Sequence, residues 1–112
     1  MNNKQQQLLN EMKKLIRSGN RKFAERKDRD IVSDLAELGL TFEDAWNIIL
    51  GLNSNFYYID PKPYYNQNNN LLTFKRKIKD KDVYIKLVLE KTIDQKFVVC
   101  LSFHRDYKKV LE

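Results

Sequence analysis

The segment from Leu71 to His104 constrains the fold most, because apolar and polar residues alternate through three consecutive stretches of it. Side chains of an extended strand point alternately to the two faces of a sheet, so this alternation is typical of half-buried strands. The buried face is expected to carry Leu72, Phe74, Ile78, Val83, Ile85, Leu87, Leu89, Phe97, Val99, Leu101 and Phe103. The open face is expected to carry Lys75, Lys77, Tyr84, Lys86, Cys100, Ser102 and His104. The segment therefore predicts three neighbouring strands with one basic face.

The loop between the first two stretches sets their register, because neighbouring side chains on paired strands must share a face. A four-residue loop over 79–82 would place Lys77 opposite Tyr84 and Lys75 opposite Lys86. The two opposed lysines would repel each other until a phosphate bound between them.

The second loop is expected to span 93–95, which would place Tyr84 opposite His104 and Lys86 opposite Ser102. A shift to the next allowed register would put Lys86 opposite His104 instead. In both registers an imidazole, a phenol and three lysines converge on one patch of the sheet.

The N-terminal half predicts helices, because its apolar residues recur at helical spacing and each segment ends near a glycine. Thr41 is expected to cap the third helix. The expected helices are 5–17, 29–38 and 42–50, the further strands are 21–26 and 55–59, and 60–70 is an irregular loop. Together these elements predict an α+β fold, with an antiparallel sheet of about four to six strands packed on one face by the N-terminal helices. We expect one domain over 1–112, with its core at 8–104 and a tail at 105–112.

Charge is distributed unevenly along this chain of net charge +6. Residues 28–60 contain one base and seven acids, whereas the rest of the chain contains twenty bases and eight acids. Such segregation favours a polyanion as the partner of the basic part. No apolar run is long enough to span a bilayer, and the polar N-terminus does not read as a signal peptide, so no membrane association is expected.

The single cysteine, Cys100, cannot form an internal disulfide, which favours a reducing cytoplasm. With one histidine and no spaced cluster of metal ligands, we expect neither a metal nor another cofactor. His104 is the one side chain that titrates unaided near neutral pH, so it is the best candidate for proton transfer. Tyrosines beside lysines suit stacking on unpaired bases.

Several short motifs resemble the MqsR family of messenger-RNA endonucleases, the toxins of bacterial toxin–antitoxin pairs with a RelE-like fold. They are residues 37–43, 47–52, 55–57, 83–86 and 101–103, with Lys13-Lys14-Leu15 and Gly19 near the N-terminus. The resemblance runs from about Lys13 to His104. It implies a metal-independent endoribonuclease that cleaves single-stranded mRNA, acts in the cytoplasm and is neutralised by a protein antitoxin; it leaves the oligomeric state open.

The family's active site maps onto this chain with departures. Its central-strand tyrosine matches Tyr84, while two of its lysines fall on Tyr58 and His104. Its glutamine falls near Leu71, with Gln67 and Asn70 as possible substitutes. The predicted catalytic residues are Tyr84, His104, Lys77 and Lys86, and the predicted RNA-binding residues are Lys75, Tyr57, Tyr58, Gln67 and Arg76. The alternatives are a non-catalytic RNA- or DNA-binding module and a protein-interaction domain that binds through the acidic segment.

Overall fold

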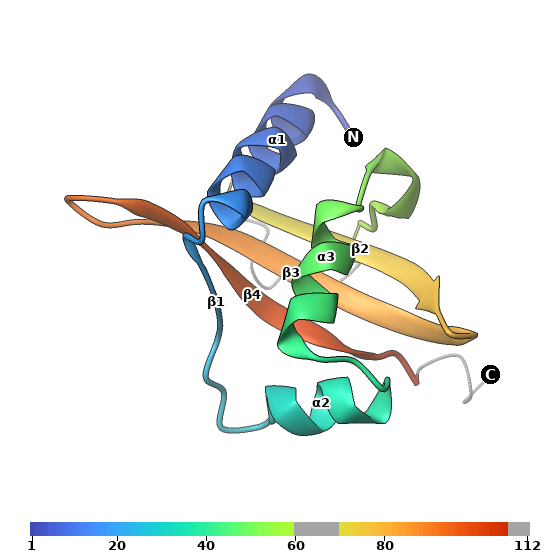
Figure 1. The fold of residues 1–112 in the computed structure, drawn as a ribbon. Helices are drawn as coiled ribbons and strands as arrows, with labels where there is room; N and C mark the ends of the chain where they lie inside the picture. Colours follow the sequence, from blue (N-terminus) through green and yellow to red (C-terminus); the bar gives the residue numbers. More distant parts are fainter. Residues whose placement is uncertain (60–69, 108–112) are drawn as a thin grey trace.

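The structure is a computed structural model that describes residues 1–59 and 70–107. Its helices are α1 (Asn3–Arg17), α2 (Ile31–Glu37) and α3 (Phe42–Leu50), followed by a short 3-10 turn, η1 (Ser54–Phe56). Its strands are β1 (Arg21–Phe23), β2 (Leu71–Ile78), β3 (Lys81–Lys91) and β4 (Lys96–Arg105). Figure 1 shows α1 and α3 lying across one face of the sheet, with α2 near the end of β4. The expected α+β architecture, with helices packed on a sheet, is confirmed.

The four strands of the described residues form one sheet in the order β1-β4-β3-β2. Both hairpins, β2–β3 and β3–β4, are antiparallel as expected. At the other edge β1 pairs parallel with β4, so the sheet is mixed and the expectation of a fully antiparallel sheet is wrong there. The connection from β1 to β4 passes through most of the chain, so no tight turn forces these two strands to run in opposite directions.

Side chains at the helix starts explain where two of the helices begin. Asn2 and Gln5 form a reciprocal capping box, so α1 starts two residues earlier than the apolar spacing predicted. Thr41 caps α3 as predicted, and Asp44 completes a second capping box by accepting the Thr41 backbone N–H at 2.9 Å. Local sequence therefore fixes these two boundaries.

One hydrophobic core joins the sheet to the three helices. It runs from Leu9 in α1 to Phe103 in β4, and Ile49 of α3 is fully buried within it. The predicted inward residues of β2 and β3 all belong to this core, which confirms the alternation in those two strands. None of the described helices is both long and apolar enough to cross a membrane.

The β2–β3 hairpin turns more tightly than predicted. Lys79 and Asp80 both have positive φ, 51° and 67°, and they form a two-residue turn that pairs Ile78 with Lys81. Two successive positive φ angles are the mark of a type I′ turn, whose twist matches that of the flanking strands. Lys79 and Lys81 donate to the backbone oxygens of residues 39 and 37 at the end of α2, at 3.2 and 3.1 Å. These bonds to the carboxyl end of a helix stabilise a register that apolar matching does not favour.

The corrected register changes which residues oppose each other. Lys75 lies opposite Tyr84 rather than Lys86, and Lys77 lies opposite Asp82. The predicted repulsion between two directly opposed lysines is therefore absent from this pair of strands. Instead, a tyrosine ring lies opposite Lys75.

Strand β4 contains a β-bulge at Leu101, because Lys86 pairs with Ser102 while Leu87 pairs with Cys100. The bulge reverses the predicted facing of the first half of β4. Val98 and Cys100 enter the core, and Leu101 lines the opposite side of the sheet. The prediction that Cys100 shares the open side is wrong: its thiol is buried, and burial raises its pKa far above the ordinary value.

Two further predictions need correction. Residues 55–59 do not form a strand: η1 ends at Phe56, and Tyr57 makes an isolated bridge to Phe74. The predicted tail begins too early, because Arg105 belongs to β4 and pairs with Val83. Most of the predicted loop at 60–70 lies outside the described residues.

Candidate functional site

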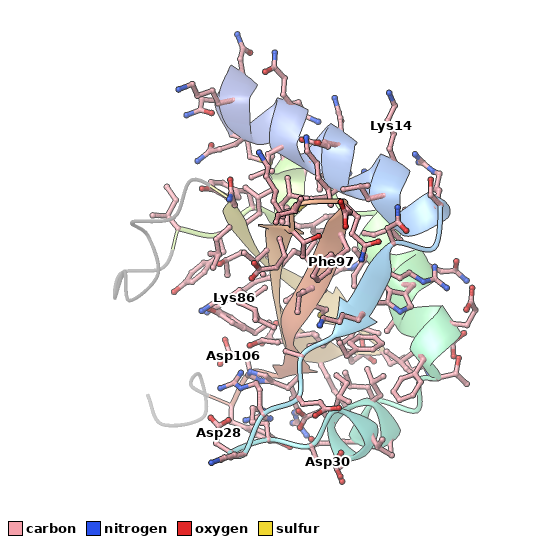
Figure 2. All side chains as sticks on the ribbon, turned by 90° about the vertical axis from the view of Figure 1, so that its left-hand side faces the viewer. Lys14, Asp28, Asp30, Lys86, Phe97 and Asp106 are labelled. Carbon is pink, nitrogen blue, oxygen red and sulfur yellow. The ribbon has the colours of Figure 1, made fainter. Side chains whose placement is uncertain are left out.

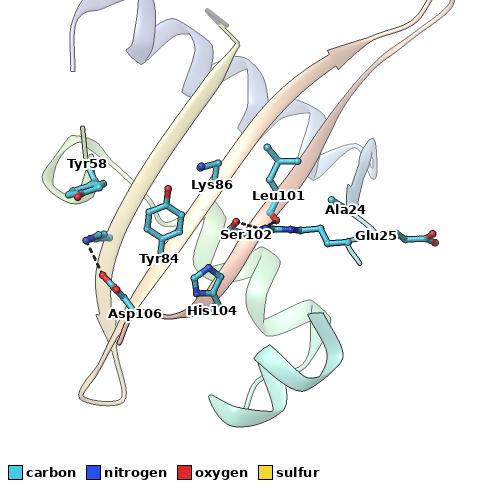
Figure 3. Close-up of a pocket in the computed structure, with 11 residues that line it drawn as sticks. Ala24, Glu25, Tyr58, Tyr84, Lys86, Leu101, Ser102, His104 and Asp106 are labelled. Carbon is cyan, nitrogen blue, oxygen red and sulfur yellow. Dashed lines mark hydrogen bonds and ion pairs between the residues drawn. The ribbon is translucent and has the colours of Figure 1, made fainter. Parts of the chain in front are cut away.

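A cleft of about 470 Å³ opens on the sheet face opposite α1 and α3. It is lined by Ala24, Glu25, Arg26, Tyr58, Lys75, Tyr84, Lys86, Leu101, Ser102, His104 and Asp106. The floor comes from β2, β3 and β4, and one wall comes from the segment that follows β1. Figure 3 shows Tyr84 and Lys86 of β3 beside Ser102 and His104 of β4. Five of the nine residues predicted to act on RNA or bind it therefore meet here: Tyr58, Lys75, Tyr84, Lys86 and His104.

Tyr84 and His104 are direct cross-strand neighbours, as predicted. The predicted pairing is correct, but the chain reaches it differently. The loop of the β3–β4 hairpin spans four residues, 92–95, rather than three, and the bulge at Leu101 restores the pairing. The two rings stack with centroids 5.6 Å apart and 25° between their planes. The phenol of Tyr84 and the imidazole of His104 are therefore stacked beside each other in the cleft.

His104 is arranged as a proton acceptor. Its Nδ1 lies 3.0 Å from the carbonyl oxygen of Arg105, which can only accept, so Nδ1 carries the proton. The neutral ring then leaves Nε2 with a lone pair. Burial lowers the pKa of His104, and the charges of Arg29 and Arg26 lower it further against the opposing effects of the Arg105 carbonyl and Asp34. The imidazole is thus uncharged at neutral pH and able to take up a proton.

Lys75 carries positive charge at the β2 side of the cleft. Its Nζ lies 2.9 Å from Asp106 Oδ2 and 4.0 Å from the centroid of the Tyr58 ring. Burial lowers the pKa of Lys75, but the hydrogen bond and charge of Asp106, together with the smaller effects of Tyr58, outweigh burial, so the net pKa is raised. Tyr58 in turn meets Tyr84 edge to face at 6.3 Å. A fixed cation and two aromatic rings therefore stand side by side.

Lys86 lies at the centre of the floor. It is paired with Ser102 across the β3–β4 ladder, and its Nζ is 5.4 Å from the centroid of the Tyr84 ring. A phosphate bound above Tyr84 would therefore lie within reach of an ammonium group.

Arg26 is a third cation of the cleft, and it was not among the residues predicted from the sequence. Its Nη1 donates to Ser102 Oγ at 3.0 Å and to the carbonyl of Leu101 at 3.2 Å. Its other edge makes two bonds with Asp28, from Nε at 3.0 Å and from Nη2 at 2.7 Å. Arg26 lies in a charged stretch without alternating apolar residues, so the sequence does not predict which face of the sheet its side chain joins. The parallel pairing of β1 with β4 brings Arg26 to the cleft. Asp106 was missed because it belonged to the predicted tail.

Four predicted site residues lie elsewhere or cannot be placed. Lys77 is exposed beyond the cleft and pairs with Asp82 at 3.4 Å. Tyr57 packs against the core, where its hydroxyl accepts a hydrogen bond from Gln5 at 2.8 Å. Arg76 points to the helix-covered face, because it pairs with the buried Val83, and its guanidinium lies 4.6 Å from the Phe56 ring. Gln67 lies outside the described residues.

Within residues 1–59 and 70–107, no three His, Cys, Asp or Glu side chains are grouped so that they could hold a metal ion. Comparison of the sequence with models of known protein families and with curated proteins finds no match. The cleft itself combines a neutral imidazole, phenol rings, a hydroxyl and three cations on one face of the sheet.

Proposed function

We propose that the protein is a metal-independent endoribonuclease that cleaves single-stranded RNA. One observation carries the proposal: the neutral His104 ring stacks on Tyr84 in a cleft that also contains Lys75, Lys86 and Arg26. RNA supplies its own nucleophile, the 2′-hydroxyl, so cleavage needs a base, an acid and cations around the phosphorus. The cleft contains all three.

Each group has a defined role in this mechanism. His104 Nε2 accepts the proton of the 2′-hydroxyl, and the 2′-oxygen attacks the adjacent phosphorus. The bond to the 5′-oxygen breaks, and the Tyr84 hydroxyl donates its proton to that leaving oxygen. The products are a 2′,3′-cyclic phosphate and a 5′-hydroxyl, and the proton on His104 returns to Tyr84 through solvent. Lys75 and Lys86 stabilise the charge that develops on the phosphoryl oxygens.

Aromatic side chains favour an unpaired substrate. The flat faces of Tyr58 and Tyr84 can stack on a base only when that base is not held within a duplex. The resemblance to the MqsR family extends the proposal: the substrate would be mRNA, the cell compartment the cytoplasm, and a protein antitoxin would neutralise the enzyme.

The proposal is tested by incubating the purified protein with end-labelled single-stranded RNA in EDTA. We expect discrete products that end in 2′,3′-cyclic phosphate. The double variant Tyr84→Phe, His104→Gln should lose cleavage while still binding RNA, because the cationic residues remain. Tyr57→Phe is the matched control, since it makes the same chemical change against the core on the other side of the sheet.

The outcomes separate the candidate functions. Binding without cleavage by the unaltered protein would favour the non-catalytic nucleic-acid-binding module. RNA binding that is insensitive to salt would contradict phosphate recognition altogether, because phosphate contacts release counterions and weaken as salt rises. Unchanged cleavage by the double variant would exclude Tyr84 and His104 as the catalytic pair.

A further inference from the structure

The guanidinium of Arg26 forms hydrogen bonds to different partners along its two edges. Its Nη1 is held by Ser102 Oγ and by the Leu101 carbonyl, both on β4, at the bulge. Its Nε and Nη2 form a parallel pair of bonds to the two carboxylate oxygens of Asp28, only two residues along the chain. β4 therefore fixes the position of the guanidinium, while Asp28 occupies its forked edge.

A phosphodiester presents two oxygens with the same geometry as the Asp28 carboxylate. Two parallel N–H···O bonds from guanidinium are the usual way that arginine binds either group. The hydrogen bond from Arg26 lowers the pKa of Asp28, so the carboxylate is ionised at neutral pH and competes as an anion. Figure 2 places Asp28 on the same side of the sheet as Lys86 and Asp106, which is the side of the cleft.

We propose that Arg26 is a phosphate-binding residue of the cleft whose forked edge is occupied by Asp28 until an RNA phosphodiester replaces it. This inference depends on the proposed RNA substrate. It adds that a carboxylate of the protein itself, that of Asp28, competes with the RNA phosphate for Arg26. On replacement, the Arg26–Asp28 bonds break, two equivalent bonds form to phosphate oxygens, and the exposed carboxylate returns to water. The bonds to Ser102 and Leu101 stay intact, so the guanidinium keeps its place.

Exposure identifies Asp28 as the exchangeable anion. Its side chain is 68% exposed, so exchanging its partner costs little desolvation. By contrast, the carboxylate of Asp106, which lines the cleft and pairs with Lys75, is only 11% exposed, and the Asp106 backbone N–H donates to the Asp82 carbonyl at 2.7 Å. Asp106 is thus held in place by β3 as well as by Lys75, whereas Asp28 is held by a side chain that can bind another anion.

The chain offers a closely matched control in the pair Arg21–Glu43. These side chains are 25% and 70% exposed, against 35% and 68% for Arg26 and Asp28, and they meet at 3.2 Å. Arg21 and Glu43 do not line the cleft. Asp28→Asn and Glu43→Gln therefore add the same charge to the molecule, but only the first removes an anion from a cleft arginine.

The experiment measures the affinity of the full chain for a single-stranded 2′-O-methyl RNA, which binds but cannot be cleaved. We expect Asp28→Asn to bind the RNA up to about fivefold more tightly than the unaltered protein, because that ratio corresponds to the free energy of an exposed ion pair. Glu43→Gln should change the affinity little. Arg26→Lys should weaken binding, because an ammonium cannot make two parallel bonds. In the Arg26→Lys background, Asp28→Asn should give no more gain than Glu43→Gln. Thermal unfolding of each variant checks that the fold is intact.

Three results would overturn the inference. Equal gains from Asp28→Asn and Glu43→Gln would show only a general effect of charge. Weaker RNA binding by a folded Asp28→Asn would show that Asp28 positions Arg26 rather than competing with RNA. Absence of RNA binding by every variant would overturn this inference together with the proposed function. Tighter binding by Asp28→Asn without cleavage of ordinary RNA would instead reject the nuclease and leave the phosphate site standing.

Discussion

At the scale of single residues, the chemistry depends on how His104 is held. The Arg105 carbonyl engages Nδ1, which fixes the tautomer, and burial keeps the ring uncharged. Arg29 and Asp34 influence the same ring with opposite signs, although they bond to each other at 2.9 and 3.1 Å. After the larger effects of burial and of the Arg105 carbonyl, Arg29 and Asp34 therefore adjust the pKa of the proposed base, a connection that the sequence did not predict.

This arrangement predicts opposite shifts from two substitutions. Arg29→Gln removes a charge that lowers the pKa of His104 and should raise that pKa, whereas Asp34→Asn should lower it. NMR titration of the ring measures both shifts directly, because His104 is the only histidine in the chain. Cleavage should fall as pH drops through the pKa of His104, since the protonated ring cannot act as a base. The acid limb should move to higher pH in Arg29→Gln and to lower pH in Asp34→Asn; shifts of the same sign would contradict this account.

At the scale of elements, two local irregularities position the cleft. The type I′ turn at 79–80 sets β2 against β3, and the bulge at Leu101 sets β4 against β3. A one-residue change in either register would move a whole set of side chains to the other face. Because of the bulge, Ser102 and His104 both line the cleft while Cys100 remains in the core.

The turn makes a stability prediction. Asp80 adopts a φ of 67°, a conformation that glycine accepts without the steric cost of a side chain. Asp80→Gly should therefore raise the free energy of unfolding by up to about 1 kcal/mol. The control is Asp94→Gly in the other hairpin, because Asp94 does not have a positive φ. Among the described residues other than glycine, positive φ occurs only at 79 and 80. That change should lower stability by roughly 0.5–1 kcal/mol. Denaturant unfolding measures both, and a loss in Asp80→Gly would argue against the two-residue turn.

At the scale of the whole molecule, the fold separates a structural face of the sheet from a functional one. The core lies between the sheet and the helices, while the cleft lies on the opposite face. The acidic segment 28–60 is partly neutralised by the basic remainder through the pairs Arg21–Glu43, Arg26–Asp28 and Arg105–Glu37. The uneven charge of the sequence thus contributes to tertiary contacts as well as to the proposed recognition of RNA.

This division predicts that substitutions on the two faces have different effects. Ile49→Ala removes a fully buried side chain of α3 and should lower the free energy of unfolding by about 2–5 kcal/mol. Lys86→Gln in the cleft should change stability by less than about 0.5 kcal/mol but weaken RNA binding. Val32→Ala on the exposed part of α2 is the control for a change of apolar volume without burial. A large loss of stability in Lys86→Gln would contradict the separation.

The α+β class, the three helices and the three consecutive strands could all be predicted from the sequence alone. These features follow from local periodicity, capping residues and alternation, which are encoded within short windows. The tertiary structure was needed to establish the parallel pairing of β1, the bulge at Leu101 that brings Tyr84 opposite His104, and the entry of Arg26 and Asp106 into the cleft. Their positions depend on contacts between segments far apart in the chain, and no local pattern records such contacts.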